Sequence, residues 1–456
     1  MTMSSVQIAA AVGAVSAGNF AVSGWSIDSR TTQAGDCFFA LRGERDGHDY
    51  VASAFGRGAS VAVVDHDLPG VGGLLLQVRE TQQALMQLGA AARTQWGGTV
   101  IGVTGSAGKT STKDAVAELV GSAFPTGRTM GNFNNHLGVP LSILRLPAEA
   151  QVGVLEMGMN HAEEIRALAR VARPSIGVVT NVGWAHAENF PDGIDGVALA
   201  KRELIEELPG DGIAVLNADD DRVRDFAKVH SGRSILYGFS AGAEVRAENV
   251  ELSEQGAKFR AVGVDFESPL AGRHGISNVL AAISAARALG IEAASLRDAV
   301  RALRPGHMRG ERSEKNGVTI INDCYNANPE AMRSMLELLA GIPARRRIAV
   351  LGEMLELGRE AETLHRGIGK FAAEQGIHAV IGIRGAARFT VDEAVKAGTS
   401  VSAAYFFSTP EEAGEFVRDF VQPGDAVLFK GSRGVQVEKA LARAFGNEGE
   451  GPGERH

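Results

Sequence analysis

The sequence has little cysteine and no long run of basic residues. Both absences exclude classes of protein. Only two of its 456 residues are cysteines, Cys37 and Cys324. They lie far apart, which argues against a disulfide framework and fits a reducing compartment. The formal net charge is −8 without a long basic run, so no nucleic-acid partner is expected. No apolar run approaches the roughly 18 residues of a membrane span, and residues 5–15 lack the cationic region of a signal peptide. We therefore expect a cytoplasmic protein.

Length and hydrophobic pattern predict an α/β fold with three domains. A chain of 456 residues exceeds what one hydrophobic core usually supports. Residues 1–98 combine short strands and turns with a helical stretch over 81–94, which indicates a small N-terminal α/β substrate module. Residues 99–310 alternate apolar strands with helices, a pattern typical of a doubly wound parallel sheet. These strands are expected at 99–103, 152–155, 176–179 and 213–216.

A third alternation predicts a C-terminal Rossmann-like α/β domain over residues 311–446. Its strands are expected at 318–322, 347–351, 379–383 and 426–429. Before it, the alternation of apolar and polar residues over 244–269 shifts toward a period of two, which predicts an antiparallel annex. A helix is expected over 277–289. The tail at 447–456 is rich in glycine and charge, so we expect it to be disordered.

The most informative motif is Thr-Gly-Ser-Ala-Gly-Lys-Thr-Ser at residues 104–111, between an apolar strand and an amphipathic helix over 113–120. This context is typical of a phosphate-binding loop, in which backbone N–H groups curl around phosphate oxygens. Lys109 would reach the β- and γ-phosphates, and the Thr110 hydroxyl would sit on Mg²⁺. A full motif has a further glycine where Val103 stands, so this loop is a shortened variant. The alternative is a glycine-rich turn with a solvated lysine.

Other candidate residues come after the strands of the central region, where ligands bind in open α/β sheets. Glu156 follows the strand at 152–155 and could bind Mg²⁺, or it could be a surface glutamate. His186 follows the strand at 176–179, although a lone histidine is more often structural. Lys201 lies in a helical pattern, where a solvated lysine is the usual interpretation.

Together with four further segments, these residues resemble the Mur ligases. The segments are Gly-Asn-Phe-Asn-Asn-His-Leu-Gly-Val-Pro at 131–140, Thr-Asn-Val-Gly at 180–183 with His186, Asn-Asp-Cys-Tyr-Asn-Ala-Asn-Pro at 322–329 and Lys-Gly-Ser-Arg at 430–433. Relatives that add earlier amino acids usually carry Tyr-Ala-His where this chain has Tyr-Asn-Ala-Asn-Pro, and the chain lacks the Asp-Asn-Pro-Arg of the diaminopimelate-adding ligase. The resemblance, which covers nearly the whole chain, implies addition of D-alanyl-D-alanine to UDP-N-acetylmuramoyl-tripeptide, the last cytoplasmic step of peptidoglycan precursor synthesis.

The resemblance also implies roles for individual residues. The catalytic residues would be Lys109, His186 and Lys201, with Lys201 carbamylated. The Mg²⁺ ligands would be Thr110, Glu156 and His186. ATP would contact Gly105, Ser106, Ala107, Gly108, Lys109, Thr110, Ser111, Asn278, Arg309 and Asp323. The UDP-muramyl peptide and the dipeptide would contact Ser29, Arg30, Asn134, Asn135, Tyr325, Asn326 and Asn328, while Glu353 and residues 430–433 would close over the site.

Some positions depart from the family pattern. His274-Gly275 stands where the family often has His-Asn, so His274 is left out of the expected site. The family pattern has two aspartates before the tyrosine, and of these only Asp323 is present in this chain. Cys324 is expected as a small buried side chain rather than a reactive thiol. Asp28 and Arg30 could instead form a surface ion pair.

The implied chemistry is ATP-dependent ligation through an acyl phosphate, carried out by a monomer. The group that deprotonates the attacking amine is not identified by sequence. A folylpolyglutamate-synthase-like or other Mur-like amide ligase would share the ATP-binding core and differ in its substrate module. A P-loop kinase or GTPase would leave residues 325–329 and the third domain without a role, and the Asn-Lys-x-Asp signature of GTPases is absent. A nucleotide-binding regulator would show no turnover.

Overall fold

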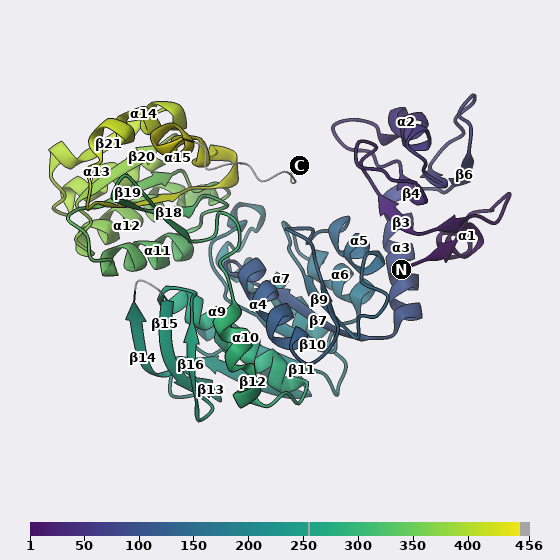
Figure 1. Cartoon of the computed structure of the whole chain (residues 1–456), viewed down its shortest axis with the longest axis horizontal. Helices are drawn as coiled ribbons and strands as arrows, with labels where there is room; N and C mark the ends of the chain where they lie inside the picture. The colour runs from purple at the N-terminus through teal and green to yellow at the C-terminus, as the bar shows by residue number, and fades with distance from the viewer. Residues whose placement is uncertain (254–255, 447–456) are drawn as a thin grey trace.

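The computed structural model describes residues 1–253 and 256–446, which form three lobes (Figure 1). Each lobe is built on its own largely parallel sheet, of four, seven and six strands in chain order. The predicted α/β class with three domains is therefore confirmed. The expected disordered tail at 447–456 lies outside the described residues. Within those described residues, no helix is long and apolar enough to cross a membrane.

The N-terminal domain has a parallel sheet of order β3-β4-β5-β6. Every residue of β4 (Asp36–Phe39) and β5 (Val61–Val64) is buried, as expected for strands covered on both faces. Helix α3 (Thr81–Trp96), predicted over 81–94, packs against two helices of the central domain. The other elements are β1 (Met3–Ser4), α1 (Ser5–Val12), β2 (Ala21–Val22), β3 (Gly24–Ser26), α2 (Val51–Gly56) and β6 (Leu74–Gln77).

The central domain has a parallel sheet of order β13-β12-β11-β10-β7-β9-β8. Helices cover both of its faces, α4 and α9 on one side and α6 and α7 on the other, which confirms the doubly wound arrangement. The strands are β7 (Thr99–Thr104), β8 (Thr126–Arg128), β9 (Val152–Glu156), β10 (Ile176–Val179), β11 (Ile213–Asn217), β12 (Arg233–Gly238) and β13 (Val245–Arg246). The helices are α4 (Lys109–Gly121), α5 (Gly138–Leu144), α6 (Glu164–Ala172), α7 (Ile194–Glu206), α8 (Asp221–Asp225), α9 (Gly272–Ala288) and α10 (Arg297–Ala302).

The predicted annex is the antiparallel sheet of β14 (Glu248–Ser253), β15 (Gly256–Ala261) and β16 (Val264–Ser268). Its expected start at residue 244 is wrong, because β13 pairs in parallel with β12 and so belongs to the main sheet. Helix α4 begins at Lys109, earlier than the amphipathic pattern indicated. The residue before it, Gly108, has φ 77°, a left-handed conformation that glycine adopts without strain.

The C-terminal domain has a sheet of order β17-β18-β22-β19-β20-β21, parallel except for the edge strand β17. All four strands expected from its sequence are present. The strands are β17 (Glu311–Lys315), β18 (Val318–Asp323), β19 (Arg347–Gly352), β20 (Ala379–Ile383), β21 (Ala404–Phe407) and β22 (Ala426–Lys430). The helices are α11 (Pro329–Gly341), α12 (Ala361–Glu374), α13 (Ala387–Lys396), α14 (Pro410–Phe420) and α15 (Glu438–Phe445).

Candidate active site

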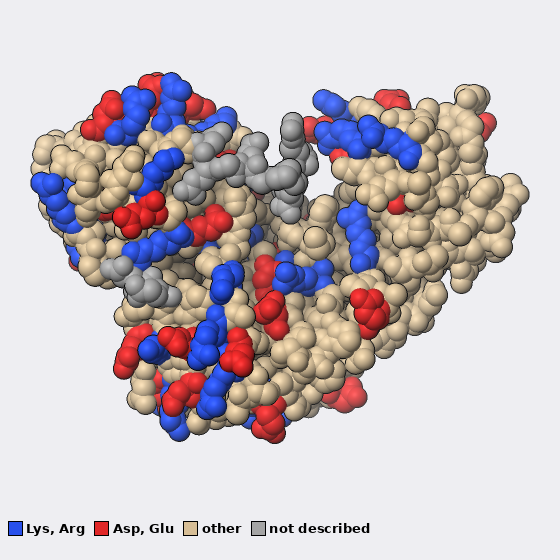
Figure 2. Space-filling view, in the orientation of Figure 1, with Lys and Arg blue, Asp and Glu red and all other residues tan. Residues whose placement is uncertain are grey.

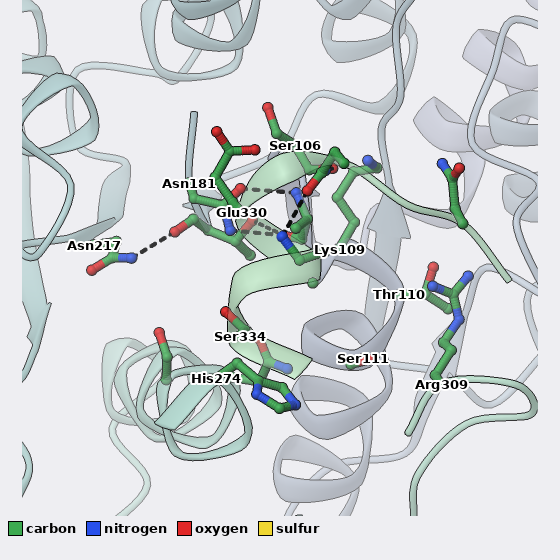
Figure 3. A pocket seen from close by; sticks show the side chains of 18 of the residues that line it. Ser106, Lys109, Thr110, Ser111, Asn181, Asn217, His274, Arg309, Glu330 and Ser334 are labelled. Atoms are coloured by element: carbon green, nitrogen blue, oxygen red, sulfur yellow. Dashed lines mark hydrogen bonds between the residues drawn. The ribbon is translucent and has the colours of Figure 1, made fainter. Parts of the chain in front are cut away.

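A cavity of about 970 Å³ lies between the central and C-terminal domains. It opens where β7, β9, β10 and β11 end, because the carboxyl ends of parallel strands meet at one edge of the sheet. Most of the site residues expected from the sequence line it: Ser106, Ala107, Gly108, Lys109, Thr110, Ser111, Asn134, Asn135, Glu156, His186, Asn278, Arg309, Asp323, Tyr325, Asn326 and Asn328. Figure 3 shows Lys109 beside Ser106 and Glu330, with Arg309 at the opposite end from Asn217.

The loop at 104–111 is fastened to the segment that follows β10. The Ser106 hydroxyl accepts from the Gly183 N–H (2.8 Å), and the Ala107 N–H donates to Asn181 Oδ1 (2.8 Å). The Thr180 hydroxyl donates to the Ala107 carbonyl (2.6 Å). These bonds fix the loop at the N-terminus of α4, where free N–H groups and the helix dipole attract an anion.

The Lys109 amine donates to the carbonyl of Gly105 (2.8 Å), so it is folded back over its own loop. Burial lowers the pKa of Lys109; the Glu156 carboxylate opposes this shift and the Arg309 guanidinium adds to it. A phosphate group in the loop would give this amine an anionic partner.

Glu156 is 1% exposed, so the interpretation as a surface glutamate is wrong. Its Oε1 accepts from Asn134 Nδ2 (2.8 Å), and its backbone N–H donates to the Thr129 hydroxyl (3.1 Å). Its Oε2 is buried and has no hydrogen-bond partner within the described residues. A buried carboxylate oxygen is costly without a partner. Because Glu156 and Thr110 both line the cavity, this unpartnered oxygen fits a hard cation such as Mg²⁺.

His186 joins the central domain to the C-terminal domain. Its Nδ1 lies 2.5 Å from Glu356 Oε2. The His186 ring lowers the pKa of the Glu356 carboxyl. Nearby, the Glu188 N–H donates to the Glu356 carbonyl (3.3 Å). The histidine thus has one nitrogen turned toward a carboxylate, an arrangement that leaves Nε2 to act as a ligand.

Lys201 is 1% exposed on α7, so the interpretation as a solvated lysine is wrong. Burial places its pKa well below the usual range, and the charge of Lys109 lowers it further. It does not line the cavity, and no hydrogen bond or ion pair links its amine to another residue in the described ranges. A neutral amine is therefore favoured at this position.

The other end of the cavity has aromatic and amide groups that suit a nucleoside. The Arg309 guanidinium lies 3.8 Å from the centre of the Tyr325 ring. Asn278 Oδ1 accepts from the Thr112 hydroxyl (3.1 Å), which ties α9 to α4. Asp323, the expected ribose acceptor, is paired with the buried Lys430 amine, which also donates to the Asn326 carbonyl (2.9 Å).

The C-terminal domain reaches the phosphate loop through the start of α11. Asn328 Oδ1 accepts from the Ala331 N–H (2.8 Å) and so caps the helix, while Nδ2 donates to the Ser106 carbonyl (3.3 Å). Next to it Glu330 packs so closely on Gly183 that a Cβ there would collide with the carboxylate. Burial raises the pKa of Glu330, whose Oε2 has no hydrogen-bond partner among the described residues.

Several predicted residues lie outside the cavity. Gly105 and Lys201 are not among the residues that line it, and Ser29 and Arg30 belong to the N-terminal domain. Arg30 Nη2 lies 2.6 Å from Asp28 Oδ2, which is the surface ion pair named as the alternative. Glu353 also lies outside the cavity lining, and its carboxylate accepts from the Ala386 N–H (2.9 Å) and from Arg384 Nε (3.3 Å), so its closing over the substrates stays a prediction.

Some residues that line the cavity were not expected from the sequence. His274, which was left out of the expected site, lines the cavity, and burial lowers its pKa. Asn217 and Glu330 also line it. Asn217 ends a buried strand of the central sheet, so the rule that located Glu156 would have located it too. Cys324 is fully buried, as expected.

The N-terminal domain presents cationic side chains along the side that faces the C-terminal domain (upper right in Figure 2). Residues 1–98 contain no lysine, so these cations are arginines. Arginine donates two parallel hydrogen bonds to a phosphate or carboxylate group. This side of the domain therefore suits an anionic ligand.

Comparisons with known proteins agree with this geometry. Three family models match the chain: "Mur ligase family, catalytic domain" over residues 21–93, "Mur ligase middle domain" over 103–286 and "Mur ligase, glutamate ligase domain" over 308–433. The UDP-N-acetylmuramoyl-tripeptide–D-alanyl-D-alanine ligase of Bacillus subtilis is 33% identical and the alignment covers 92% of each chain. A crystal structure of MurF from Acinetobacter baumannii matches with TM-score 0.90 and 30% identity, covering 98% of this chain and 99% of that one. The MurF ligase of Thermotoga maritima in complex with ADP matches with TM-score 0.80 and 28% identity, covering 92% and 96%.

Proposed function

Because this chain belongs to the Mur ligase family, we propose that it joins D-alanyl-D-alanine to UDP-N-acetylmuramoyl-tripeptide at the expense of ATP. The observation that carries the proposal is the cavity in which a phosphate loop, a buried carboxylate and the 325–329 segment of the C-terminal domain meet. The similarity to dipeptide-adding ligases over most of the chain supports this choice of substrates.

In the proposed reaction, the γ-phosphoryl group of ATP moves to a carboxylate oxygen of the tripeptide and ADP leaves. The dipeptide amine then attacks the acyl carbon, phosphate departs and the nitrogen loses a proton. The first step brings carboxylate against triphosphate, so the loop N–H groups and Lys109 are needed to neutralise charge. Since two domains enclose the cavity, closure would keep water from the acyl phosphate.

We propose that Thr110, Glu156 and His186 hold Mg²⁺, which when bound would offset the charge of the phosphates. Two observations support this assignment: Glu156 Oε2 is buried and unpartnered, and His186 has Nδ1 against Glu356, which leaves Nε2 as the ligand atom. We further propose that Asn278, Arg309, Asp323 and Tyr325 hold the adenosine, and that Asn134, Asn135, Asn326 and Asn328 lie between the nucleotide and the peptide substrates.

We propose a UDP-muramyl site on the N-terminal domain that includes Ser29 and Arg30. We propose that the N-terminal domain spans residues 1–98, the central domain 99–310 and the C-terminal domain 311–446, since β7 begins at Thr99 and β17 at Glu311. Two buried free cysteines fit a reducing cytoplasm, where we propose that the protein acts as a monomer.

Phosphate release from ATP is expected to require both UDP-N-acetylmuramoyl-tripeptide and D-alanyl-D-alanine, because the acyl phosphate forms on one substrate and is resolved by the other. A colorimetric phosphate assay with each substrate omitted in turn measures this requirement. Equal turnover when D-glutamate replaces the dipeptide, or when a folate replaces the tripeptide, would contradict the proposed function.

Replacing Glu156 with alanine is expected to raise the Mg²⁺ concentration needed for half-maximal turnover, since the unpartnered carboxylate oxygen is lost. Magnesium titrations of the purified variant and wild type, at saturating ATP and peptide substrates, measure the change. An unaltered magnesium dependence would remove Glu156 from the metal site.

A further inference from the structure

Lys113 is a buried cation that none of the roles above uses. It lies one helical turn beyond Lys109 on α4 and is 2% exposed. Its amine donates to the carbonyls of Thr129 (2.9 Å) and Gly131 (3.1 Å), and it lies 3.2 Å from Asp114 Oδ1. A buried charge is costly unless it is paired. An ammonium group has three N–H donors, and the Lys113 amine has three oxygen atoms close to it.

The two carbonyls belong to a turn that leads from β8 to the Asn134 loop. The same turn contacts Glu156 twice. The Thr129 hydroxyl accepts from the Glu156 N–H (3.1 Å), and farther along Asn134 Nδ2 donates to Glu156 Oε1 (2.8 Å). The segment from 129 to 134 therefore holds both the backbone and one carboxylate oxygen of Glu156, which leaves Oε2 pointing free.

We propose that Lys113 is a positioning residue for the metal site. By holding the turn at 129–131 against α4, it fixes Asn134 and so aims Glu156 Oε2 at the position of the cation. Since α4 also begins with Lys109 and Thr110, this one helix fixes the position of the Glu156 carboxylate relative to the phosphate loop. Groups behind a metal ligand commonly set metal affinity in this way. The inference rests on the proposed function of Glu156.

The test measures metal binding without turnover. Lys113→Met keeps a long side chain but removes all three donors. In the presence of ADP, its Mn²⁺ affinity, measured by electron paramagnetic resonance, is expected to fall by about tenfold or more, the range seen when groups behind a metal ligand are lost. ADP affinity without metal, measured by calorimetry, is expected to stay at the wild-type value. Lys228→Met is the matched control, because the Lys228 side chain is 74% exposed and paired with a surface aspartate.

A purely structural role for Lys113 gives a different result. The melting temperature of Lys113→Met would then fall, while the folded protein would bind Mn²⁺ like wild type, and this outcome overturns the inference. If Lys113→Met does not fold, Lys113→Gln serves instead. It removes the ammonium group and keeps a polar end that can donate to a carbonyl of the turn. Weakened Mn²⁺ binding by folded Lys113→Gln supports the inference, and wild-type binding overturns it.

Glu156→Ala in the same assay separates this inference from the proposed metal site. If Glu156→Ala binds Mn²⁺ weakly and Lys113→Met binds it normally, only the role of Lys113 fails. If Glu156→Ala itself binds Mn²⁺ like wild type, the metal site fails, and the role of Lys113 fails with it.

Discussion

Lys109→Ala is expected to lower kcat by about 100-fold or more, the loss typical of removing one preorganised charge-stabilising donor. In the structure the Lys109 amine is held over the phosphate loop by the Gly105 carbonyl. Alanine would leave the loop amides in place, so ADP binding should persist while phosphoryl transfer slows. Phosphate release at saturating substrates measures kcat, and calorimetry measures ADP binding.

Lys228→Ala is the control for the loss of one lysine, because its side chain is solvated and does not line the cavity. It should turn over like wild type. A Lys109→Ala enzyme with wild-type kcat would show that the loop binds phosphate without using this amine in the transition state.

Lys201→Arg is expected to be almost inactive, although arginine is the conservative replacement for lysine. We propose that the Lys201 amine is carbamylated, because burial and the neighbouring Lys109 charge hold its pKa well below the usual range. A neutral amine reacts with CO₂ to give an anion and release a proton, whereas a guanidinium does not. That anion could bind water on the proposed Mg²⁺ and orient it.

Two measurements test the carbamate directly. Protein equilibrated with ¹³C-bicarbonate should show a carbamate carbonyl signal by NMR that is absent from Lys201→Arg. Lys201→Ala, assayed with millimolar formate or acetate, should recover part of the lost activity, because a small carboxylate could occupy the vacated space. Full activity of Lys201→Arg, together with no carbamate signal in wild type, would show that Lys201 is a buried neutral lysine and nothing more.

The strands and much of the site could be predicted because apolar runs in the central domain are followed directly by residues that can bind a ligand. Glu156 ends β9, and the phosphate loop follows β7. The position of a residue in a parallel sheet then fixes which edge it reaches. Asn217 ends β11 in the same way, and only the lack of a resemblance at that position kept it out of the expected site.

The buried lysines were harder to predict because a helical lysine is usually solvated. The signal was nevertheless present in the helical period. On α7 the buried positions Val197, Ala200, Lys201 and Leu204 form one stripe, and on α4 the stripe is Lys113, Val116, Ala117 and Val120. A lysine within an apolar stripe must find partners inside the protein. The partners themselves, such as the carbonyls of Thr129 and Gly131, come from another element and could not be inferred from spacing.

Contacts between domains were the least predictable, because they depend on how separately folded units meet. The Glu356 carboxylate reaches His186 from a loop about 170 residues later in the chain. No local pattern near residue 356 marks it as a neighbour of the site.

The two atoms of the Asn328 side-chain amide have separate structural roles. Its oxygen caps α11 and its nitrogen reaches the Ser106 carbonyl. Aspartate would keep the cap, since a carboxylate oxygen accepts the same N–H, but it would set an acceptor against an acceptor at Ser106. Aspartate at this position would therefore leave the C-terminal domain well folded and weaken its contact with the phosphate loop, so folding of the domain and its docking can be lost separately.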